Sequence, residues 1–163
     1  MTPFKILFLC TGNSARSILG EYLIRHIAPG RFKSFSAGSN PTGVVNPLII
    51  RYLKEQWKID ASDARSKSWE EFKETAFDFV ITVCDNAKES CPIWPGQPII
   101  AHWGLPDPAS FEGTDPQKLE MIHQVALGMK RRLDLFTSLP FEKLERLKLH
   151  EAVSNIGQVL GTS

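Results

Sequence analysis

The sequence alternates short apolar runs with segments that carry apolar residues at helical spacing, and this alternation limits what the chain can fold into. The first unit is an apolar run at residues 5–9, followed by a turn and by apolar residues at helical spacing as far as Ile27. Further apolar runs at residues 32–37, 77–83 and 98–102 are expected to be strands. Strands that alternate with helices form parallel sheets with right-handed crossovers.

Helical periodicity returns at residues 47–57 and 116–136, and residues 141–159 read as one more helix or as two short ones. We therefore expect an α/β fold with a four-stranded parallel sheet and helices on both faces, the three-layer arrangement of Rossmann-like proteins. Residues 77–83 are mostly apolar and partly β-branched, as in a central strand covered on both faces. In such sheets ligands bind beyond the carboxyl ends of the strands.

The length and the net charge of the chain limit which classes of function are possible. The 163 residues fit a single domain, residues 1–163, in which residues 141–163 form a C-terminal helical extension. The 19 basic and 18 acidic residues leave a net charge of +1, so no strong field draws the chain to nucleic acid or to a membrane surface. The first apolar run is too short for a signal peptide or a membrane span. We expect a cytoplasmic protein without nucleic-acid or membrane partners.

The cysteines are Cys10, Cys84 and Cys91, an odd number that a static set of disulfides cannot use up. At least one thiol must stay free or exchange partners, and in a reducing compartment cysteines are more often catalytic, metal-binding or redox-active than structural. Cys84 and Cys91 lack the paired C-x-x-C spacing that zinc usually needs. We expect no metal and no cofactor. The histidines, which show no ligand spacing either, are His26, His102, His123 and His150.

The strongest local signal is Cys10 followed by five residues, Arg16 and Ser17, between a strand end and a helix start. Backbone N–H groups of such a loop and the helix dipole can converge on one tetrahedral oxyanion. Arg16 adds a planar charged fork that grips two oxygens. The same donors and the Ser17 hydroxyl are expected to lower the pKa of Cys10 below about 8.5, which suits attack on a phosphate or arsenate centre. The expected oxyanion-binding residues are Thr11, Gly12, Asn13, Ser14, Ala15 and Arg16.

These residues resemble the active-site loop of the low-molecular-weight protein tyrosine phosphatase family, whose order of strands and helices also matches most of the chain. In that family the cysteine is the nucleophile and the arginine binds the oxyanion, which implies these roles for Cys10 and Arg16. Ser17 matches the hydroxyl residue that follows the arginine. The family also uses an aspartate in a late loop as general acid on the leaving group, and Asp107, within residues 105–108, matches that aspartate.

The other two cysteines narrow the resemblance to arsenate reductases built on this phosphatase fold, especially the thioredoxin-coupled type. The resemblance implies that Cys10 attacks arsenate, that Cys84 then attacks the Cys10 sulfur and releases arsenite, and that Cys91 resolves the Cys10–Cys84 disulfide. Thioredoxin would reduce the final disulfide, and phosphate or sulfate would compete with arsenate. The stretches that carry this resemblance, besides the loop, are residues 82–84, 91–92 and 102–109.

Two other functions stay open. A protein tyrosine or small-molecule phosphatase would use only the first cysteine, the arginine and the aspartate, with Cys84 and Cys91 as protective thiols. In tyrosine phosphatases the acid and the proline are usually followed by a tyrosine. Here Ala109 and Ser110 follow, which weakens the phosphatase alternative. The third possibility is a non-catalytic protein that binds an anion or senses redox state.

A cation near the loop is a separate question. Some of these reductases bind potassium there, and Asn13, Glu21 and Ser36 match three of the ligand positions, whereas Lys67 stands where their acidic ligand aligns. The resemblance therefore implies that an ammonium group takes the place of the cation. We expect that no metal is required and that potassium gives no rate gain over sodium.

Overall fold

The computed structural model describes residues 2–84, 92–143 and 145–159. Its strands are β1 (Phe4–Cys10), β2 (Phe32–Gly38), β3 (Phe79–Thr82) and β4 (Ile99–His102). Its α-helices are α1 (Arg16–Ile27), α2 (Pro47–Trp57), α4 (Asp115–Thr137) and α5 (Arg146–Ile156). Its 3-10 helices are η1 (Trp69–Phe72) and η2 (Pro108–Ser110).

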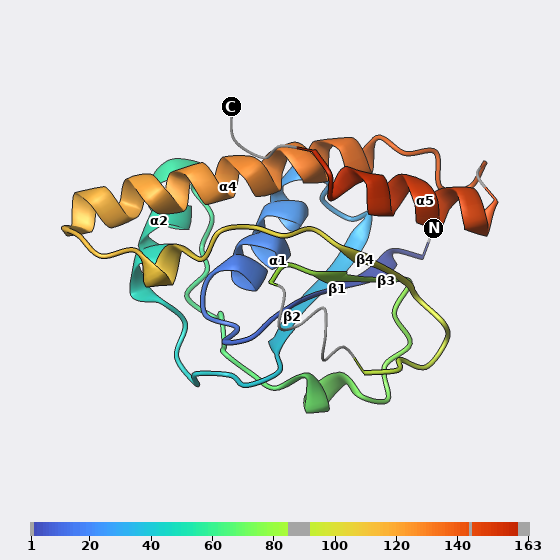
Figure 1. Ribbon diagram of the computed structural model, residues 1–163, viewed down its shortest axis with the longest axis horizontal. Helices are drawn as coiled ribbons and strands as arrows, with labels where there is room; N and C mark the ends of the chain where they lie inside the picture. The colour runs from blue at the N-terminus through green and yellow to red at the C-terminus, as the bar shows by residue number, and fades with distance from the viewer. Residues whose placement is uncertain (1, 85–91, 144, 160–163) are drawn as a thin grey trace.

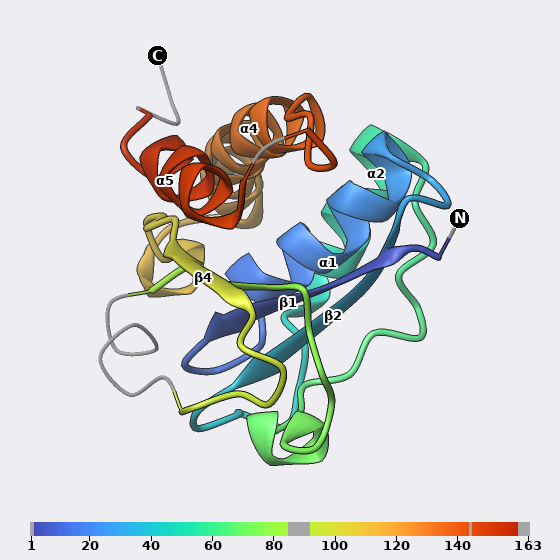
Figure 2. The same cartoon turned by 90° about the vertical axis from the view of Figure 1, so that its right-hand side faces the viewer.

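The four strands form one parallel sheet in the order β2-β1-β3-β4, which confirms the expected α/β fold with a four-stranded parallel sheet. Helices α1, α4 and α5 lie on one side of this sheet, and η1 lies on the other (Figure 1 and Figure 2). On the η1 side, the ring of Phe35 in β2 lies 5.4 Å from that of Phe72. Over the described residues this second face is therefore covered by a short 3-10 helix and by loops.

The element bounds differ from the predicted ones in physically simple ways. β3 is shorter than the apolar run 77–83, because β4 pairs only with Phe79 to Thr82. Helix α4 begins one residue earlier than predicted, where the side chains of Thr114 and Gln117 form a reciprocal capping box. The tail contributes one described helix, α5. Within the described parts of the chain, no helix combines the length and hydropathy needed to cross a bilayer.

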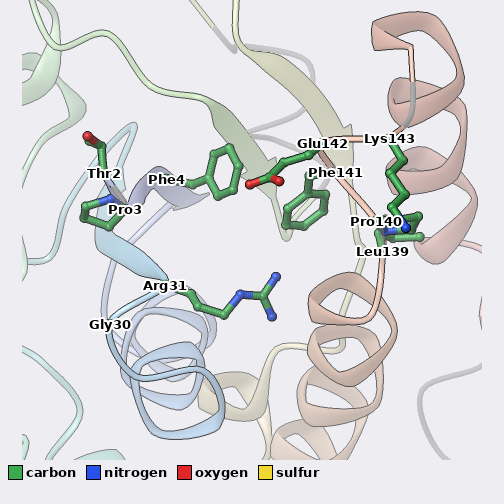
Figure 3. Close-up of a pocket in the computed structure, with 10 residues that line it drawn as sticks. All are labelled: Thr2, Pro3, Phe4, Gly30, Arg31, Leu139, Pro140, Phe141, Glu142 and Lys143. Atoms are coloured by element: carbon green, nitrogen blue, oxygen red, sulfur yellow. The ribbon is translucent and has the colours of Figure 1, made fainter.

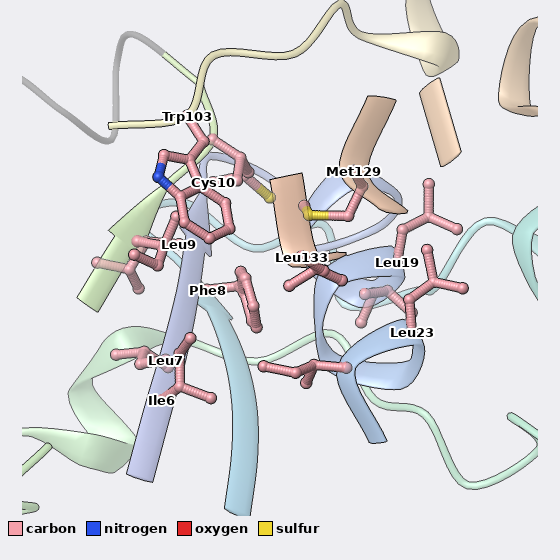
Figure 4. Close-up of a cluster of buried hydrophobic side chains, with 14 of the residues drawn as sticks. Ile6, Leu7, Phe8, Leu9, Cys10, Leu19, Leu23, Trp103, Met129 and Leu133 are labelled. Carbon is pink, nitrogen blue, oxygen red and sulfur yellow. The ribbon is translucent and has the colours of Figure 1, made fainter. Parts of the chain in front are cut away.

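The centre of the core is β1, whose residues Ile6 to Leu9 are fully buried. Figure 4 shows Phe8 of this strand among side chains of α1 and α4, with Cys10 at the end of the same strand. Helix α1 comes close to Phe8 because residue 20 is a glycine: a Cβ there would lie 2.7 Å from Cδ1 of the Phe8 ring. A strand packed this tightly places Cys10 rigidly at the carboxyl edge of the sheet.

Candidate active site

The loop between β1 and α1 is held from outside by the segment that follows β2. Backbone carbonyls of residues 10, 11, 12 and 14 accept hydrogen bonds of 2.9–3.1 Å from N–H groups in residues 39–46. In a planar trans peptide the N–H and C=O groups point in opposite directions. Because the loop carbonyls point toward residues 39–46, the N–H groups of the same peptides point away from that segment. No described side chain caps the N-terminus of α1. The loop and the positive end of the helix can therefore serve an anion together.

Cys10 lies at the base of this loop and is 3% exposed. Its sulfur lies 2.9 Å from the Ser17 hydroxyl oxygen and accepts a 3.1 Å hydrogen bond from the backbone N–H of Asn13. Asn13 itself has a left-handed backbone conformation, with φ of 48°. The predicted contact between Ser17 and Cys10 is thus present.

The expected lowering of the Cys10 pKa is wrong for this structure. Burial raises the pKa of the Cys10 thiol above its ordinary value, and the hydrogen bonds from Ser17 and Asn13 lower it without cancelling the effect of burial. The nearby Cys84 raises it slightly further. Sequence reasoning counted the donors around the sulfur but had no measure of how completely the folded chain removes it from water.

Arg16 joins the loop to the segment that carries Asp107. Its guanidinium donates a 3.1 Å hydrogen bond to the backbone carbonyl of Leu105 and lies 3.7 Å from the Asp107 carboxylate. The Arg16 side chain is 15% exposed and the Asp107 side chain 41%. The structure therefore brings the predicted arginine and the predicted acid to one place, with the acid open to solvent beside the mouth of the loop.

The second cysteine also reaches the loop. Cys84 follows β3, is buried, and its sulfur lies 3.2 Å from the Thr11 hydroxyl oxygen. Cys10 and Cys84 are both free thiols. Parallel strands β1 and β3 are neighbours in the sheet, so residues at their carboxyl ends meet at the same edge. Cys91 lies outside the described residues.

Lys67 lies behind the loop, on the side of β2, close to the three residues that match the cation ligands of the similar reductases. Its Nζ lies 3.4 Å from Oδ1 of Asn13, 3.3 Å from Oγ of Ser36 and 3.9 Å from Oε1 of Glu21. No cluster of three or more histidine, cysteine, aspartate or glutamate side chains that could hold a metal ion occurs in the described part of the chain. The ammonium group thus lies within 4.0 Å of all three oxygens.

Sequence reasoning missed the residues that shape the loop from outside. The segment 39–46 has the composition of an ordinary turn, and nothing in its letters shows that its N–H groups hold the loop carbonyls. Gly38 belongs with it, because a Cβ at that position would collide with the carbonyl oxygen of Thr11. A glycine at the end of a strand was the available signal for such a close approach.

A cavity of ≈ 300 Å³ lies at the other end of β1, far along the strand from Cys10. Figure 3 shows Phe4, Arg31 and Phe141 around it. Arg31 donates a 2.8 Å hydrogen bond to the carbonyl of Thr137, the last residue of α4. None of the predicted site residues lines this cavity.

The comparison with protein families agrees with the loop geometry. The model for low molecular weight phosphotyrosine protein phosphatases matches residues 5–143. The chain belongs to this family. Similar members are the arsenate reductase of Oceanobacillus iheyensis, 35% identical over 136 residues that cover 83% of this chain and 96% of that protein, and the arsenate reductase of Bacillus subtilis, 34% identical over 131 residues that cover 80% and 93%.

Solved structures of arsenate reductases show a similar fold. An arsenate reductase in a phosphate-binding state is 30% identical, with a TM-score of 0.68 over 80% of this chain and 94% of that one. A thioredoxin-dependent arsenate reductase of Corynebacterium glutamicum is 28% identical, with a TM-score of 0.59; the match covers 82% of this chain and 63% of that protein. Helix α5 lies beyond the residues that match the family model.

Proposed function

We propose that this chain reduces arsenate to arsenite with its own thiols, and that thioredoxin reduces the disulfide that remains. The observation that carries the proposal is the Cys84 sulfur, buried 3.2 Å from the hydroxyl of Thr11 in the same loop that begins with Cys10. Hydrolysis of a phosphate ester needs one thiol, whereas a two-electron reduction needs a second thiol near the first. The similar proteins named arsenate reductases support the same choice.

In the first step the Cys10 thiolate attacks arsenic, and an S–As bond forms while an As–O bond breaks. The loop N–H groups and Arg16 stabilise the oxyanion as charge builds up on it. Asp107, close to Arg16 at the mouth of the loop, donates a proton to the departing oxygen, which leaves as water. Arsenic is still pentavalent after this step and is covalently bound to Cys10.

In the second step the Cys84 thiolate attacks the Cys10 sulfur. The S–As bond breaks and its electron pair goes to arsenic, which leaves as trivalent arsenite, while a Cys10–Cys84 disulfide forms. Two cysteine sulfurs are oxidised and one arsenic is reduced, so the electrons balance. The Thr11 hydroxyl, 3.2 Å from the Cys84 sulfur, can donate to the attacking thiolate.

In the third step Cys91 attacks the Cys84 sulfur, and the Cys10 thiolate is the leaving group. The resulting Cys84–Cys91 disulfide takes two electrons and two protons from the dithiol of thioredoxin, which returns all three thiols to the reduced state. A cycle of this kind suits a reducing cytoplasm. Phosphate and sulfate, as tetrahedral oxyanions, would compete with arsenate for the loop.

The test combines two assays on the same set of variants: arsenate turnover with a thioredoxin regenerating system, and hydrolysis of an aryl phosphate. Cys10→Ser is expected to lose both activities. Cys84→Ser and Cys91→Ser are expected to lose steady turnover and to keep whatever hydrolysis the wild type has. Full turnover in both resolving-cysteine variants would contradict the relay. Hydrolysis without arsenate turnover in the wild type would indicate a phosphatase. Absence of both activities in the wild type would indicate a non-catalytic regulator.

A further inference from the structure

The cavity of ≈ 300 Å³ at the amino-terminal end of β1 is built by three separate parts of the chain. Phe4 comes from β1, Arg31 directly precedes β2, and residues 141–143 follow α4. Phe4 lies six positions before Cys10 in the same strand, which corresponds to about 20 Å at the rise of a β-strand. Pockets for small molecules begin at about this volume. The cavity therefore has room for a molecule of one or two rings, well away from the loop that begins with Cys10.

Aromatic rings form the inner wall of the cavity. The rings of Phe4 and Phe141 lie 5.2 Å apart in an edge-on arrangement, with an interplanar angle of 83°. Phe141 is buried and is supported from behind by Phe79 and Phe136, whose ring centroids lie 5.3 Å and 5.0 Å from its own. Faces and edges of fixed rings favour a further aromatic ring in an edge-to-face or offset contact. This wall is formed before any ligand arrives, which lowers the cost of binding.

The charged group at this wall is the guanidinium of Arg31. Its Nη1 donates a 2.8 Å hydrogen bond to the carbonyl of Thr137, and its Cζ lies 5.5 Å and 5.9 Å from the ring centroids of Phe32 and Phe141. Among the described residues no carboxylate forms an ion pair with Arg31, and the other N–H groups of its guanidinium have no partner. The partial negative charge at the end of α4 offsets only about half of the positive charge. Arg31 is thus held in place with donors to spare.

The outer side of the cavity carries one charge of each sign. Glu142 and Lys143 are both exposed, so the charged lining residues have a net charge of +1, which equals the charge of Arg31. Figure 3 shows the guanidinium of Arg31 extending toward Phe141, with the ring of Phe4 and the carboxylate of Glu142 across the space from it. A ligand with a single negative charge balances this set. A small hydrated ion such as phosphate would lose water against the apolar wall without replacing those contacts.

We propose that this cavity binds a small aromatic carboxylate, whose ring packs against Phe4 and Phe141 and whose carboxylate pairs with Arg31. The planar guanidinium offers two parallel N–H groups, which match the two oxygens of a carboxylate. The aromatic wall supplies the apolar contact, and the cation fixes the orientation of the ligand. The site is separate from the proposed chemistry of Cys10, and its occupation does not depend on that chemistry.

The first experiment titrates the ¹⁵N-labelled wild-type protein with 2-naphthoate and follows the backbone amide signals by NMR. Saturable shifts are expected at residues 30–32 and 141–143, with a Kd of about 0.1–1 mM, as for a well-fitted ligand of this size. 2-Naphthalenemethanol, which has the rings without the charge, is expected to bind at least about five-fold more weakly. Inorganic phosphate and acetate are expected to leave these amides unchanged. The proposal is overturned by naphthoate shifts confined to residues 10–16, by no saturable shift, by equal affinity for the alcohol, or by the same shifts with phosphate or acetate.

The second experiment compares variants of the charged residues at the cavity. Arg31→Gln is expected to weaken 2-naphthoate binding at least about ten-fold, the effect of a lost charge-assisted hydrogen bond. Lys33→Gln is the matched control, because Lys33 is an exposed cation two residues away that does not line the cavity, and its affinity is expected to equal that of the wild type. Glu142→Gln removes the repelling carboxylate and is expected to tighten binding about two-fold or more.

Melting temperatures show whether each variant is folded, since Arg31 also holds the end of α4. Glu142 is exposed and makes no such contact in the described part of the chain, so Glu142→Gln decides the question if Arg31→Gln does not fold. A folded Arg31→Gln variant with wild-type affinity would overturn the proposal. Unchanged or weaker binding in Glu142→Gln would overturn it as well.

Discussion

The hydroxyl oxygen of Thr11 lies 3.2 Å from the sulfur of Cys84, although 73 positions separate the two residues in the sequence. Thr11 directly follows Cys10, so this contact connects the two thiols of the proposed relay through a single side chain. A thiolate can only accept a hydrogen bond, so once Cys84 ionises the hydroxyl is the donor. In the proposed relay the Thr11 hydroxyl would therefore donate to the attacking Cys84 sulfur.

Removal of this hydroxyl tests that role. Thr11→Val keeps the shape of the side chain and removes the donor, and steady arsenate turnover is expected to fall by about three- to ten-fold, the effect of one hydrogen bond. Thr11→Ser retains the hydroxyl and is the control. Rapid-mixing measurements with Thr11→Val are expected to show slower release of arsenite and unchanged formation of the Cys10 adduct. Equal turnover in Thr11→Val and Thr11→Ser would rule out a contribution of the hydroxyl.

Arg16→Lys tests the contribution of the planar guanidinium group, which can bind two oxygens at once. Lysine retains the positive charge but cannot bind two oxygens in one plane, and it cannot also reach the Leu105 carbonyl and Asp107 in the same way. We expect kcat/KM for arsenate to fall by about a hundred-fold, in the range found when a preorganised oxyanion donor is removed. Steady-state kinetics with a thioredoxin regenerating system would measure it. A loss of less than two-fold would show that charge alone is sufficient.

The pH dependence of stability follows from the buried Cys10. Burial raises the pKa of this thiol, so the folded chain holds the Cys10 proton more strongly than the unfolded chain does. The stabilisation is complete below the ordinary thiol pKa of about 8.5 and is lost as the pH rises through that value toward the raised pKa. Urea unfolding of the wild type is expected to lose free energy in this range. Cys10→Ala is expected to lose less, and parallel curves for the two proteins would contradict the assignment.

Potassium is expected to have no specific effect on the rate. The oxygens of Asn13, Ser36 and Glu21 already surround the ammonium of Lys67, and a potassium ion among them would lie against that positive charge. Arsenate turnover measured in potassium and in sodium salts at equal ionic strength would therefore be the same. A rate gain in potassium alone would show that Lys67 leaves the site or that a cation binds elsewhere.

Sequence reasoning was reliable where local pattern and chain order decide the outcome. Alternation of apolar runs and helical segments predicted the parallel sheet, because each strand must be buried and each crossover helix must cover it. The spacing from Cys10 to Ser17 predicted a loop at the end of β1, which the structure contains. The bounds of the helices and strands were less predictable. They depend on capping side chains such as Thr114 and on pairing with a neighbouring strand.

The sequence alone determined the fold class, the loop that begins with Cys10, and the three cysteines that make a thiol exchange possible, since these depend on residue type and local order. Only the tertiary structure decided how those residues meet. It placed Cys84 against Thr11 and Arg16 beside Asp107. It also placed Lys67 behind Asn13 and buried Cys10 deeply enough to raise its pKa. Distances between remote residues and the loss of water around a group arise from packing of the whole chain, which no local pattern contains.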